Sequence, residues 1–405
     1  MNLKWTMPAF AAVCAMAAMP VAAQSWGPRD LAELKQEAQR RAERRLPPVG
    51  NVKPEDMREA LAGLDSLEPD AWAAAFSRVG DRYMQAAKMQ QPAAARESYY
   101  HAWHAYNTAR WPTENSPGKK QAYARALEAF QAYGRLLDPP LETVRIPFEG
   151  KEVVAYLRLP PNVRPAPLVM GIAGLDTRKE DVAAAGDNFL KRGIGILALD
   201  MPGTGQAPLK VEVGAERIFS RVLDYLQTRK DVDAGRIVVR GQSWSGYWSA
   251  LVAYTEVNRV RGAVVHGVGV DGYFQPEFQK KGLTTREYLF DLLPARASVY
   301  GARTMEEFLA YGPQLSLVKL GWIDKPSASM LLVNGEKDTQ QPIADLYLMM
   351  KHGDPKDAWV NPEGGHMGRS EQWPQARILE RVVMPWIERA LAVPAGKPAA
   401  VSNSQ

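Results

Sequence analysis

Short apolar runs that alternate with helical stretches set the strongest limit on how this chain can fold. Five such runs occur after residue 140, at positions 168–172, 195–199, 237–239, 263–265 and 330–333. Continuous apolar runs separated by helices are typical of buried parallel strands in βαβ units. A hairpin of two further strands, 144–148 and 153–159, is expected just before them. The pattern therefore predicts an α/β fold with a mostly parallel central sheet flanked by helices.

The region before residue 140 shows helical periodicity and no strand-like alternation. Helices are expected at 54–64, 69–87, 93–110 and 119–136. Pro139 and Pro140 close this region, because two consecutive prolines end a helical pattern.

The change of pattern predicts the division of the chain into domains. We expect an all-helical N-terminal cap domain at 24–140 and a catalytic domain at 141–392. Within the catalytic domain, residues 271–325 fit the βαβ rhythm poorly and are expected to form an insertion. The Pro-, Ala- and Ser-rich tail at 393–405 is expected to be disordered.

The first residues have the organisation of a cleavable export signal. Lys4 gives a minimal positive region, and the apolar run at 7–19 is too short to span a bilayer. Small residues precede Ala23, so we expect residues 1–23 to be a signal peptide that is cut after Ala23. The mature protein would then be periplasmic or secreted, without stable membrane insertion. The alternative is an uncleaved anchor.

Several kinds of site are excluded by composition. The only cysteine, Cys14, lies inside the signal, so the mature chain would have no disulfide, no catalytic thiolate and no Cys-ligated metal. With five histidines and no H-E-x-x-H motif, no metal site is expected. Gly203 and Gly205 lack the spacing of a dinucleotide fingerprint, and no cofactor is expected.

Charge limits the partners in the same way. The chain has 50 basic and 45 acidic residues, a formal net charge of +5, and no long block of one sign. Interspersed charges of this kind are typical of solvated helix faces and do not favour a nucleic-acid partner. We therefore expect a small-molecule substrate, and a homodimer is left open.

A candidate nucleophile lies in the motif G-Q-S-W-S-G at 241–246, between an expected strand and a helical run at 247–254. A serine at such a sharp turn is held in a strained conformation that exposes its hydroxyl, and the next backbone N–H, from Trp244, can stabilise an oxyanion. The motif departs from G-x-S-x-G because Ser245 replaces the second glycine. Ser243 has the correct offset from Gly241 and is the predicted nucleophile. Ser245 as nucleophile and an ordinary Gly/Ser turn are the alternatives.

The acid and the base are expected farther along the chain. Asp338 follows the strand at 330–333, and His366 lies in a glycine-rich loop before the C-terminal helix. The order Ser, Asp, His is that of the α/β-hydrolases. His366 would take the proton of Ser243, and Asp338 would orient the imidazole. Glu336 and Asp271 compete for the acid role, but the loop before Asp338 has the expected length.

With these residues in place, the chain resembles the FrsA-like branch of the α/β-hydrolase superfamily, the branch of 2,6-dihydroxypseudooxynicotine hydrolase. Residues 173–180 (AGLDTRKE) look like that family's G-G-L-[DE]-S-x-K-E segment, and residues 200–205 look like its D-x-P-G-x-G turn. The resemblance implies a helical domain packed over the active site and an oxyanion N–H from Gly174 or Leu175 that pairs with that of Trp244. The sequence departs from the family in Ile172, where many members have histidine, and in Ser245.

Aromatic residues crowd the expected helix at 93–110, where Trp103 and Tyr106 share one face. One interpretation is that this face docks the helical domain on the sheet domain, because aromatic side chains dominate interface burial. The other is that Trp103 and Tyr106 bind an aromatic substrate.

The function that these features predict is an exported serine hydrolase. It would cleave a small ester, thioester or lactone through a Ser-His-Asp triad and an acyl-enzyme, without a cofactor. The first alternative is a C–C bond hydrolase that acts on a β-diketone-like or aromatic ketone substrate, because that chemistry needs the same groups. The second is a catalytically silent binding protein on a hydrolase scaffold.

Overall fold

The computed structural model describes residues 29–392. The predicted signal peptide at 1–23, with its cleavage after Ala23, and the predicted tail at 393–405 lie outside the described residues. Within the described range, no helix combines the length and the apolar character needed to cross a membrane.

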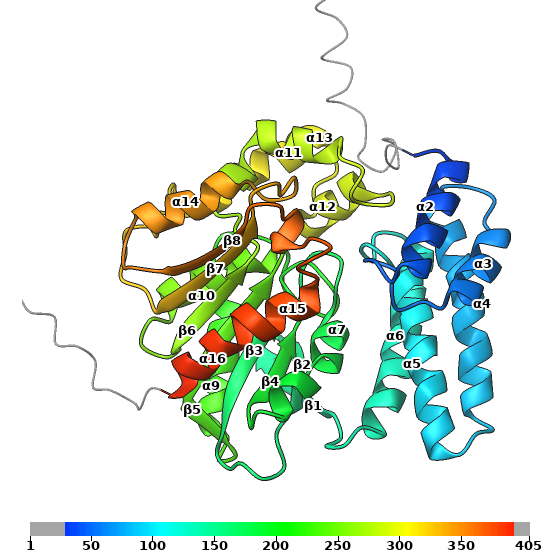
Figure 1. The fold of residues 1–405 in the computed structure, drawn as a ribbon, viewed down its shortest axis with the longest axis horizontal. Helices are drawn as coiled ribbons and strands as arrows, with labels where there is room; N and C mark the ends of the chain where they lie inside the picture. The colour runs from blue at the N-terminus through cyan, green and yellow to red at the C-terminus, as the bar shows by residue number, and fades with distance from the viewer. Residues whose placement is uncertain (1–28, 393–405) are drawn as a thin grey trace, which may run out of the picture.

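An eight-stranded sheet forms the centre of the molecule (Figure 1), with strand order β1-β2-β4-β3-β5-β6-β7-β8. The strands are β1 (Glu142–Phe148), β2 (Lys151–Arg158), β3 (Ala166–Ile172), β4 (Gly195–Leu199), β5 (Val232–Gln242), β6 (Gly262–His266), β7 (Ser329–Gly335) and β8 (Asp357–Asn361). β1 and β2 pair antiparallel, and so do β2 and β4; all other pairs are parallel. The predicted hairpin turns at Glu149 and Gly150, both at positive φ.

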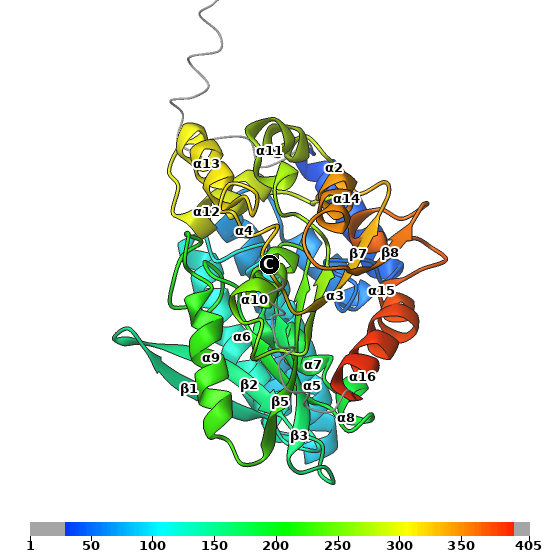
Figure 2. The ribbon, with the colours of Figure 1, turned by 90° about the vertical axis from the view of Figure 1, so that its left-hand side faces the viewer.

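Helices cover both faces of the sheet (Figure 2). One face packs against α9 (Arg217–Thr228), α10 (Ser245–Thr255) and α14 (Ile343–Lys351). The other packs against α7 (Lys179–Ala184), α8 (Asp187–Leu190), α15 (Gln375–Ile378) and α16 (Met384–Ala392). Because both faces are covered, the central strands are continuously buried, which explains their uninterrupted apolar runs.

The N-terminal region is helical and lies beside the sheet (Figure 1). Its helices are α2 (Leu31–Glu43), α3 (Pro54–Ala62), α4 (Pro69–Ala87), α5 (Pro92–Ala109) and α6 (Pro117–Arg135). Four of the five begin with proline, whose fixed φ and missing N–H suit the first helical position. The ring of Phe130 on α6 packs 5.3 Å from that of Tyr156 on β2, so the helical region shares a hydrophobic core with the sheet.

Helices and turns lie between β6 and β7, in the range where the sequence predicts an insertion at 271–325. This segment contains η2 (Gly272–Phe274), α11 (Pro276–Leu283), α12 (Leu292–Tyr300), α13 (Met305–Tyr311) and η3 (Gly312–Leu315). An ion pair between Lys119 on α6 and Asp291, with both side chains fully buried, joins this insertion to the helical region. The Arg29 guanidinium also donates to the carbonyls of Arg286 and Tyr288 at 2.5 and 2.6 Å. The insertion and the helical region therefore meet beyond the carboxyl ends of the strands.

Candidate active site

Ser243 occupies the turn between β5 and α10. Its φ is +54°, in the left-handed region that costs an L-residue about 1–2 kcal/mol. The turn is tight: a Cβ added to Gly241 would lie 1.7 Å from the Ser245 carbonyl oxygen, and one added to Gly246 would lie 1.8 Å from that of Gly267. Only glycine fits at these two positions, so strand and helix approach closely and Ser243 projects from the turn.

Ser245 has a different environment from Ser243. Its side chain is fully buried, and its hydroxyl donates a hydrogen bond to the carbonyl of Ala173 at the end of β3. The close approach that the second glycine of G-x-S-x-G would allow is made at Gly246 instead. The geometry therefore favours Ser243 over Ser245 as the nucleophile.

The structure brings Ser243, His366 and Asp338 together. The Oγ of Ser243 lies 2.7 Å from Nε2 of His366, and Nδ1 of His366 lies 3.0 Å from Oδ2 of Asp338. Asp338 follows β7, and His366 lies beyond β8 at the start of η4 (His366–Gly368). The two alternative acids are engaged elsewhere, since Glu336 accepts from the Tyr347 hydroxyl and Asp271 from the Ser316 hydroxyl.

Asp338 is buried but well supplied with donors. Its Oδ1 accepts the N–H groups of Gln340 and Gln341 at 2.7 and 3.0 Å, and its Oδ2 accepts that of Met367 at 3.2 Å. Burial alone would raise the pKa of this carboxyl, but the charge and hydrogen bond of His366, together with the two glutamine amides, outweigh burial and lower the pKa. An ionised Asp338 assigns the imidazole proton to Nδ1, which leaves Nε2 free to accept from the Ser243 hydroxyl.

The expected oxyanion donors lie next to Ser243. A Cβ added to Gly174 would lie 3.4 Å from the Ser243 Cβ, so the segment after β3 approaches the nucleophile closely. The Gly174 amide already donates to the Thr177 hydroxyl at 2.8 Å. Within residues 29–392, the amides of Leu175 and Trp244 donate to no other protein group. Of the two alternatives after β3, Leu175 therefore has the free N–H.

The segment that carries Gly174 and Leu175 is also bonded to the helical region. Arg110, at the end of α5, donates to the Asp176 carbonyl at 2.8 Å, and the indole N–H of Trp111 donates to the Asp176 carboxylate at 3.3 Å. Ser245 bonds the preceding residue, Ala173. The segment is therefore held from two sides. One is the turn between β5 and α10 that carries Ser243 and Ser245, called the elbow below, and the other is the helical region.

Two residues near the triad had no signal in the sequence. The fully buried His266 bonds the Met367 carbonyl through Nε2 at 2.9 Å, next to His366. Burial, helped by the charge of Arg240, lowers the pKa of His266 to about 3, so the ring is neutral. The side-chain amide of Gln341 donates to the Ser243 carbonyl at 3.0 Å. Both residues bond main-chain groups, which no sequence motif records.

Asp345 on α14 was missed for the same reason. Its carboxylate accepts four N–H groups in a row at the start of the insertion, at distances from 2.7 to 3.1 Å: those of Val270, Asp271, Gly272 and Tyr273. This fixes the path of the chain from β6 into the insertion. The ring of Tyr273 in turn lies 5.9 Å from that of Trp244, so the start of the insertion packs against the elbow.

Trp103 and Tyr106 lie within the helical region. The ring of Trp103 packs against Phe130 at 4.7 Å and His104 at 4.0 Å, and the Tyr106 hydroxyl donates to Asp81 on α4 at 2.6 Å. No contact joins either side chain to Ser243 or His366 in the described chain. These contacts are made inside the helical region, so both the docking interpretation of the face and the substrate-binding role of the two residues stay predictions. Among residues 29–392, no cluster of His, Cys, Asp or Glu side chains is arranged to hold a metal ion.

Comparison with known proteins gives consistent matches. A family model described as esterase FrsA-like matches residues 60–346. Esterase FrsA of Vibrio vulnificus (strain YJ016) is 27% identical over 230 residues, which cover 56% of this chain and 54% of that protein. The α/β hydrolase ucsC of Acremonium sp is 26% identical over 235 residues, covering 49% and 47%. The chain thus spans about half the length of the curated relatives it matches.

Two solved structures match most of the chain. That of 2,6-dihydroxy-pseudo-oxynicotine hydrolase has a TM-score of 0.69 at 20% identity and covers 89% of this chain and 95% of its own. That of AbyA5 has a TM-score of 0.67 at 23% identity and covers 90% and 99%. At these identities the likeness concerns the fold, and it confirms the predicted α/β-hydrolase fold with a helical N-terminal region.

Proposed function

The chain belongs to the FrsA-like esterase family, as its sequence predicted, and from this premise we propose that it is a serine hydrolase acting on a small ester, thioester or lactone. One observation carries the proposal: Ser243 stands at positive φ with its hydroxyl 2.7 Å from Nε2 of His366. A strained serine within hydrogen-bond reach of a histidine that is oriented by a carboxylate is the arrangement that activates a weak nucleophile.

In the proposed reaction, Nε2 of His366 takes the Ser243 proton as Oγ attacks the substrate carbonyl carbon. The carbonyl oxygen becomes an oxyanion that accepts hydrogen bonds from the amides of Trp244 and Leu175. The tetrahedral intermediate collapses, the bond to the leaving oxygen or sulfur breaks, and His366 gives that atom the proton. Water then attacks the acyl-enzyme by the same steps, which releases the acid and restores Ser243.

A second candidate is hydrolysis of the C–C bond of an aromatic ketone. It is favoured by the rings of Trp111 and Tyr288, which stack at 5.4 Å beside Asp176, the residue after Leu175. The Trp111 ring is itself buried in this stack, so the half-buried Tyr288 ring is the part of it that a flat substrate would meet. The fold likeness to 2,6-dihydroxy-pseudo-oxynicotine hydrolase points in the same direction. In this reaction the leaving group is a carbanion, which takes the proton at carbon.

Labelling with a fluorophosphonate probe tests the nucleophile. We expect stoichiometric labelling of the protein and a peptide modified at Ser243, with no labelling of Ser243→Ala. Asp338→Asn should label at least a hundredfold more slowly, because the imidazole loses its orienting charge. Glu336→Gln is the matched control and should label like the wild type, since within residues 29–392 Glu336 bonds only Tyr347 and the main chain. Persistent labelling of folded Ser243→Ala, or none of the folded wild type, would refute the proposal.

The substrate class is separated by turnover. p-Nitrophenyl acetate and benzoylacetone are assayed side by side, and the products are identified by mass spectrometry. Turnover of the ester alone supports the first candidate, and cleavage of the diketone supports the second.

We also propose that the protein is exported through its predicted signal peptide. The charged start, the apolar run at 7–19 and the small residues before Ala23 support this. Expression of the full chain in a Gram-negative host, fractionation and N-terminal sequencing test it. A mature protein that begins at Gln24 in the periplasm is expected, and a full-length cytoplasmic protein would contradict the proposal.

A further inference from the structure

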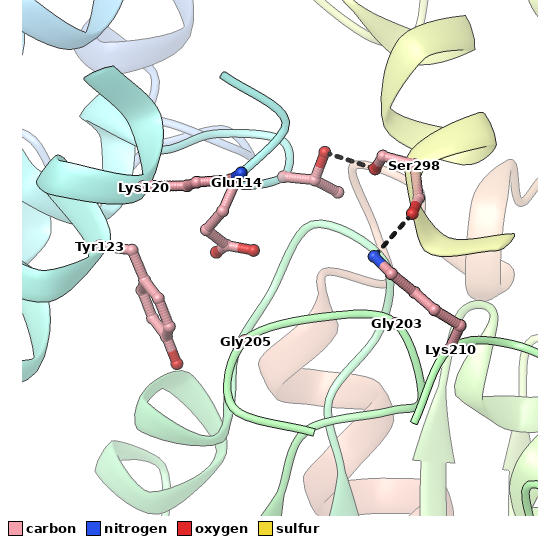
Figure 3. A pocket seen from close by; sticks show the side chains of 8 residues that line it. Glu114, Lys120, Tyr123, Gly203, Gly205, Lys210 and Ser298 are labelled. Atoms are coloured by element: carbon pink, nitrogen blue, oxygen red, sulfur yellow. Dashed lines mark hydrogen bonds between the residues drawn. The ribbon is translucent and has the colours of Figure 1, made fainter. Parts of the chain in front are cut away.

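A cleft of about 320 Å³ lies between the helical region and the loop that follows β4 (Figure 3). Its walls come from both parts of the chain: Thr113, Glu114, Lys120, Tyr123, Gly203, Gly205, Lys210 and Ser298. Neither Ser243 nor His366 lines it, so it is distinct from the candidate active site. Ligand pockets of about 300–1,000 Å³ are typical for small molecules, and this cleft is at the small end of that range.

Two lysines enter the cleft from opposite walls (Figure 3). Lys120 comes from α6, and Lys210 follows the loop after β4, where its ammonium donates to the Ser298 carbonyl at 2.9 Å. Neither ammonium lies within 4.0 Å of a carboxylate in the described part of the chain. Burial lowers the pKa of Lys210; Glu114 opposes this, and the like charge of Lys120 adds to it. The positive charge of Lys120 therefore acts on Lys210 across the cleft.

The acidic groups around the cleft already have cationic partners. Glu114 binds the Arg178 guanidinium through both carboxylate oxygens, each at 2.8 Å. Burial would raise the pKa of Glu114, but Arg178 and Arg110 outweigh it and lower the pKa to about 2. Behind Tyr123, the fully buried Lys179 bonds Asp200 and Glu180, each at 2.9 Å. Among residues 29–392, the two cleft lysines thus have no carboxylate within ion-pair distance, and the acidic side chain that lines the cleft, Glu114, is already paired with Arg178.

The remaining wall is main chain from the turn at 200–205. Gly203 and Gly205 have φ of +84° and +52°. A Cβ on Gly203 would lie 2.5 Å from the Val299 carbonyl oxygen, and one on Gly205 would lie 2.4 Å from the Asp200 carboxylate. Asp200 fixes the turn by accepting from the amides of Lys179 and Gln206. The turn is therefore rigid and bare of side chains where it borders the cleft.

We propose that this cleft binds a small doubly charged oxyanion, a phosphate monoester or a dicarboxylate, between Lys120 and Lys210. Two ammonium groups are point charges that suit the diffuse charge of such an anion. The turn at Gly203 and Gly205 contributes no side chain to the cleft and so leaves steric room for the anion between the two lysines. This site is independent of the proposed hydrolysis, because its evidence does not involve the triad.

Isothermal titration calorimetry of the full chain in phosphate-free, low-salt buffer tests the site, with glycerol phosphate and succinate as separate probes. We expect one saturable site for at least one probe, and the probe that binds identifies the anion class. Lys120→Gln and Lys210→Gln should each weaken binding about tenfold, since each removes one charge-assisted contact. Both side chains are exposed, so both variants should keep the melting temperature of the wild type.

Lys356→Gln is the matched control. The Lys356 ammonium, like that of Lys210, donates to main-chain carbonyls, here those of His352 and Asp354, and burial lowers its pKa as it does that of Lys210. Lys356 follows α14 and does not line the cleft. This variant should bind like the wild type, and so should His366→Ala. The proposal is overturned if neither probe binds saturably, if all three lysine variants weaken binding equally, or if His366→Ala abolishes binding, which would place the anion at the triad.

Discussion

The Ser245 hydroxyl offers a test of how the elbow and the oxyanion segment depend on each other. Ser245→Ala removes the hydrogen bond to the Ala173 carbonyl and leaves that carbonyl unpaired in a fully buried position. Loss of one such partner costs about 1–3 kcal/mol of folding free energy. The lost bond also frees one side of the segment that carries Leu175, whose amide is a proposed oxyanion donor.

The effect on activity can be bounded from the structure. Complete loss of one oxyanion donor lowers kcat by roughly 100- to 1,000-fold. After Ser245→Ala the segment still has its bonds from Arg110 and Trp111 to Asp176, so displacement of the Leu175 amide is partial. We therefore expect kcat for p-nitrophenyl acetate to fall by about tenfold, with KM nearly unchanged, because the donor acts mainly in the transition state.

Ser249→Ala provides the control on the same helix. Ser249 is also fully buried on α10, but its hydroxyl lies 3.0 Å from the carbonyls of Gly246 and Val264 and does not reach the segment after β3. Urea unfolding should show similar losses of stability for the two variants, while only Ser245→Ala should lose kcat. If the two variants have the same kcat within a factor of two, the hydroxyl of Ser245 does not position the oxyanion segment and the reasoning fails.

Three further predictions concern the surroundings of the site. Gly246→Ala should yield no soluble folded protein in an expression and circular dichroism assay, because the new Cβ would lie 1.8 Å from the Gly267 carbonyl oxygen. The pKa of Glu114 is about 2 in the folded protein, against 4.5 for a free carboxyl. Because the folded pKa is the lower one, the stability that ionised Glu114 contributes is present above pH 4.5 and is lost as the pH falls towards 2. Urea unfolding should therefore show a smaller loss of stability for Glu114→Gln than for the wild type between pH 4.5 and pH 2. His266→Leu should lower kcat by about tenfold, because it removes the bond to the Met367 carbonyl. His266→Gln should lower kcat much less, since glutamine can still donate to that carbonyl. Equal kcat values for the two variants would show that this bond does not position the loop that carries His366.

The central sheet was predictable because strands that are buried on both faces need apolar residues at consecutive positions, which gives continuous apolar runs. The elbow was predictable because a sharp strand-to-helix turn needs Gly241 and a glycine after the serine. β8 escaped prediction: its sequence is only partly buried at the sheet edge, so Asp357–Asn361 carries no apolar run. The order of Ser243, Asp338 and His366 along the chain located three side chains that the folded sheet brings within hydrogen-bond distance.

The finer choices depended on contacts that a sequence does not encode locally. The sequence does not decide whether Gly174 or Leu175 supplies the oxyanion N–H. The structure favours Leu175, because the Gly174 amide donates to the Thr177 hydroxyl. His266 and Gln341 act through main-chain carbonyls, far along the chain from their own positions, and any donor of the right length would serve. Similarly, the aromatic residues on the face of Trp103 and Tyr106 do not by themselves distinguish a packing surface from a substrate site, since both need large aromatic surfaces.

The bonds from Arg110 and Trp111 to Asp176 bear on how such proteins can be recombined. Here Arg110 and Trp111, at the end of α5, bond the segment that carries Leu175, whose amide is a proposed oxyanion donor. We therefore expect a chimaera with a foreign helical region to loosen the proposed oxyanion segment unless it keeps the guanidinium and the indole at these two places. The helical region of this chain would then not be separable from the sheet without a change in the chemistry.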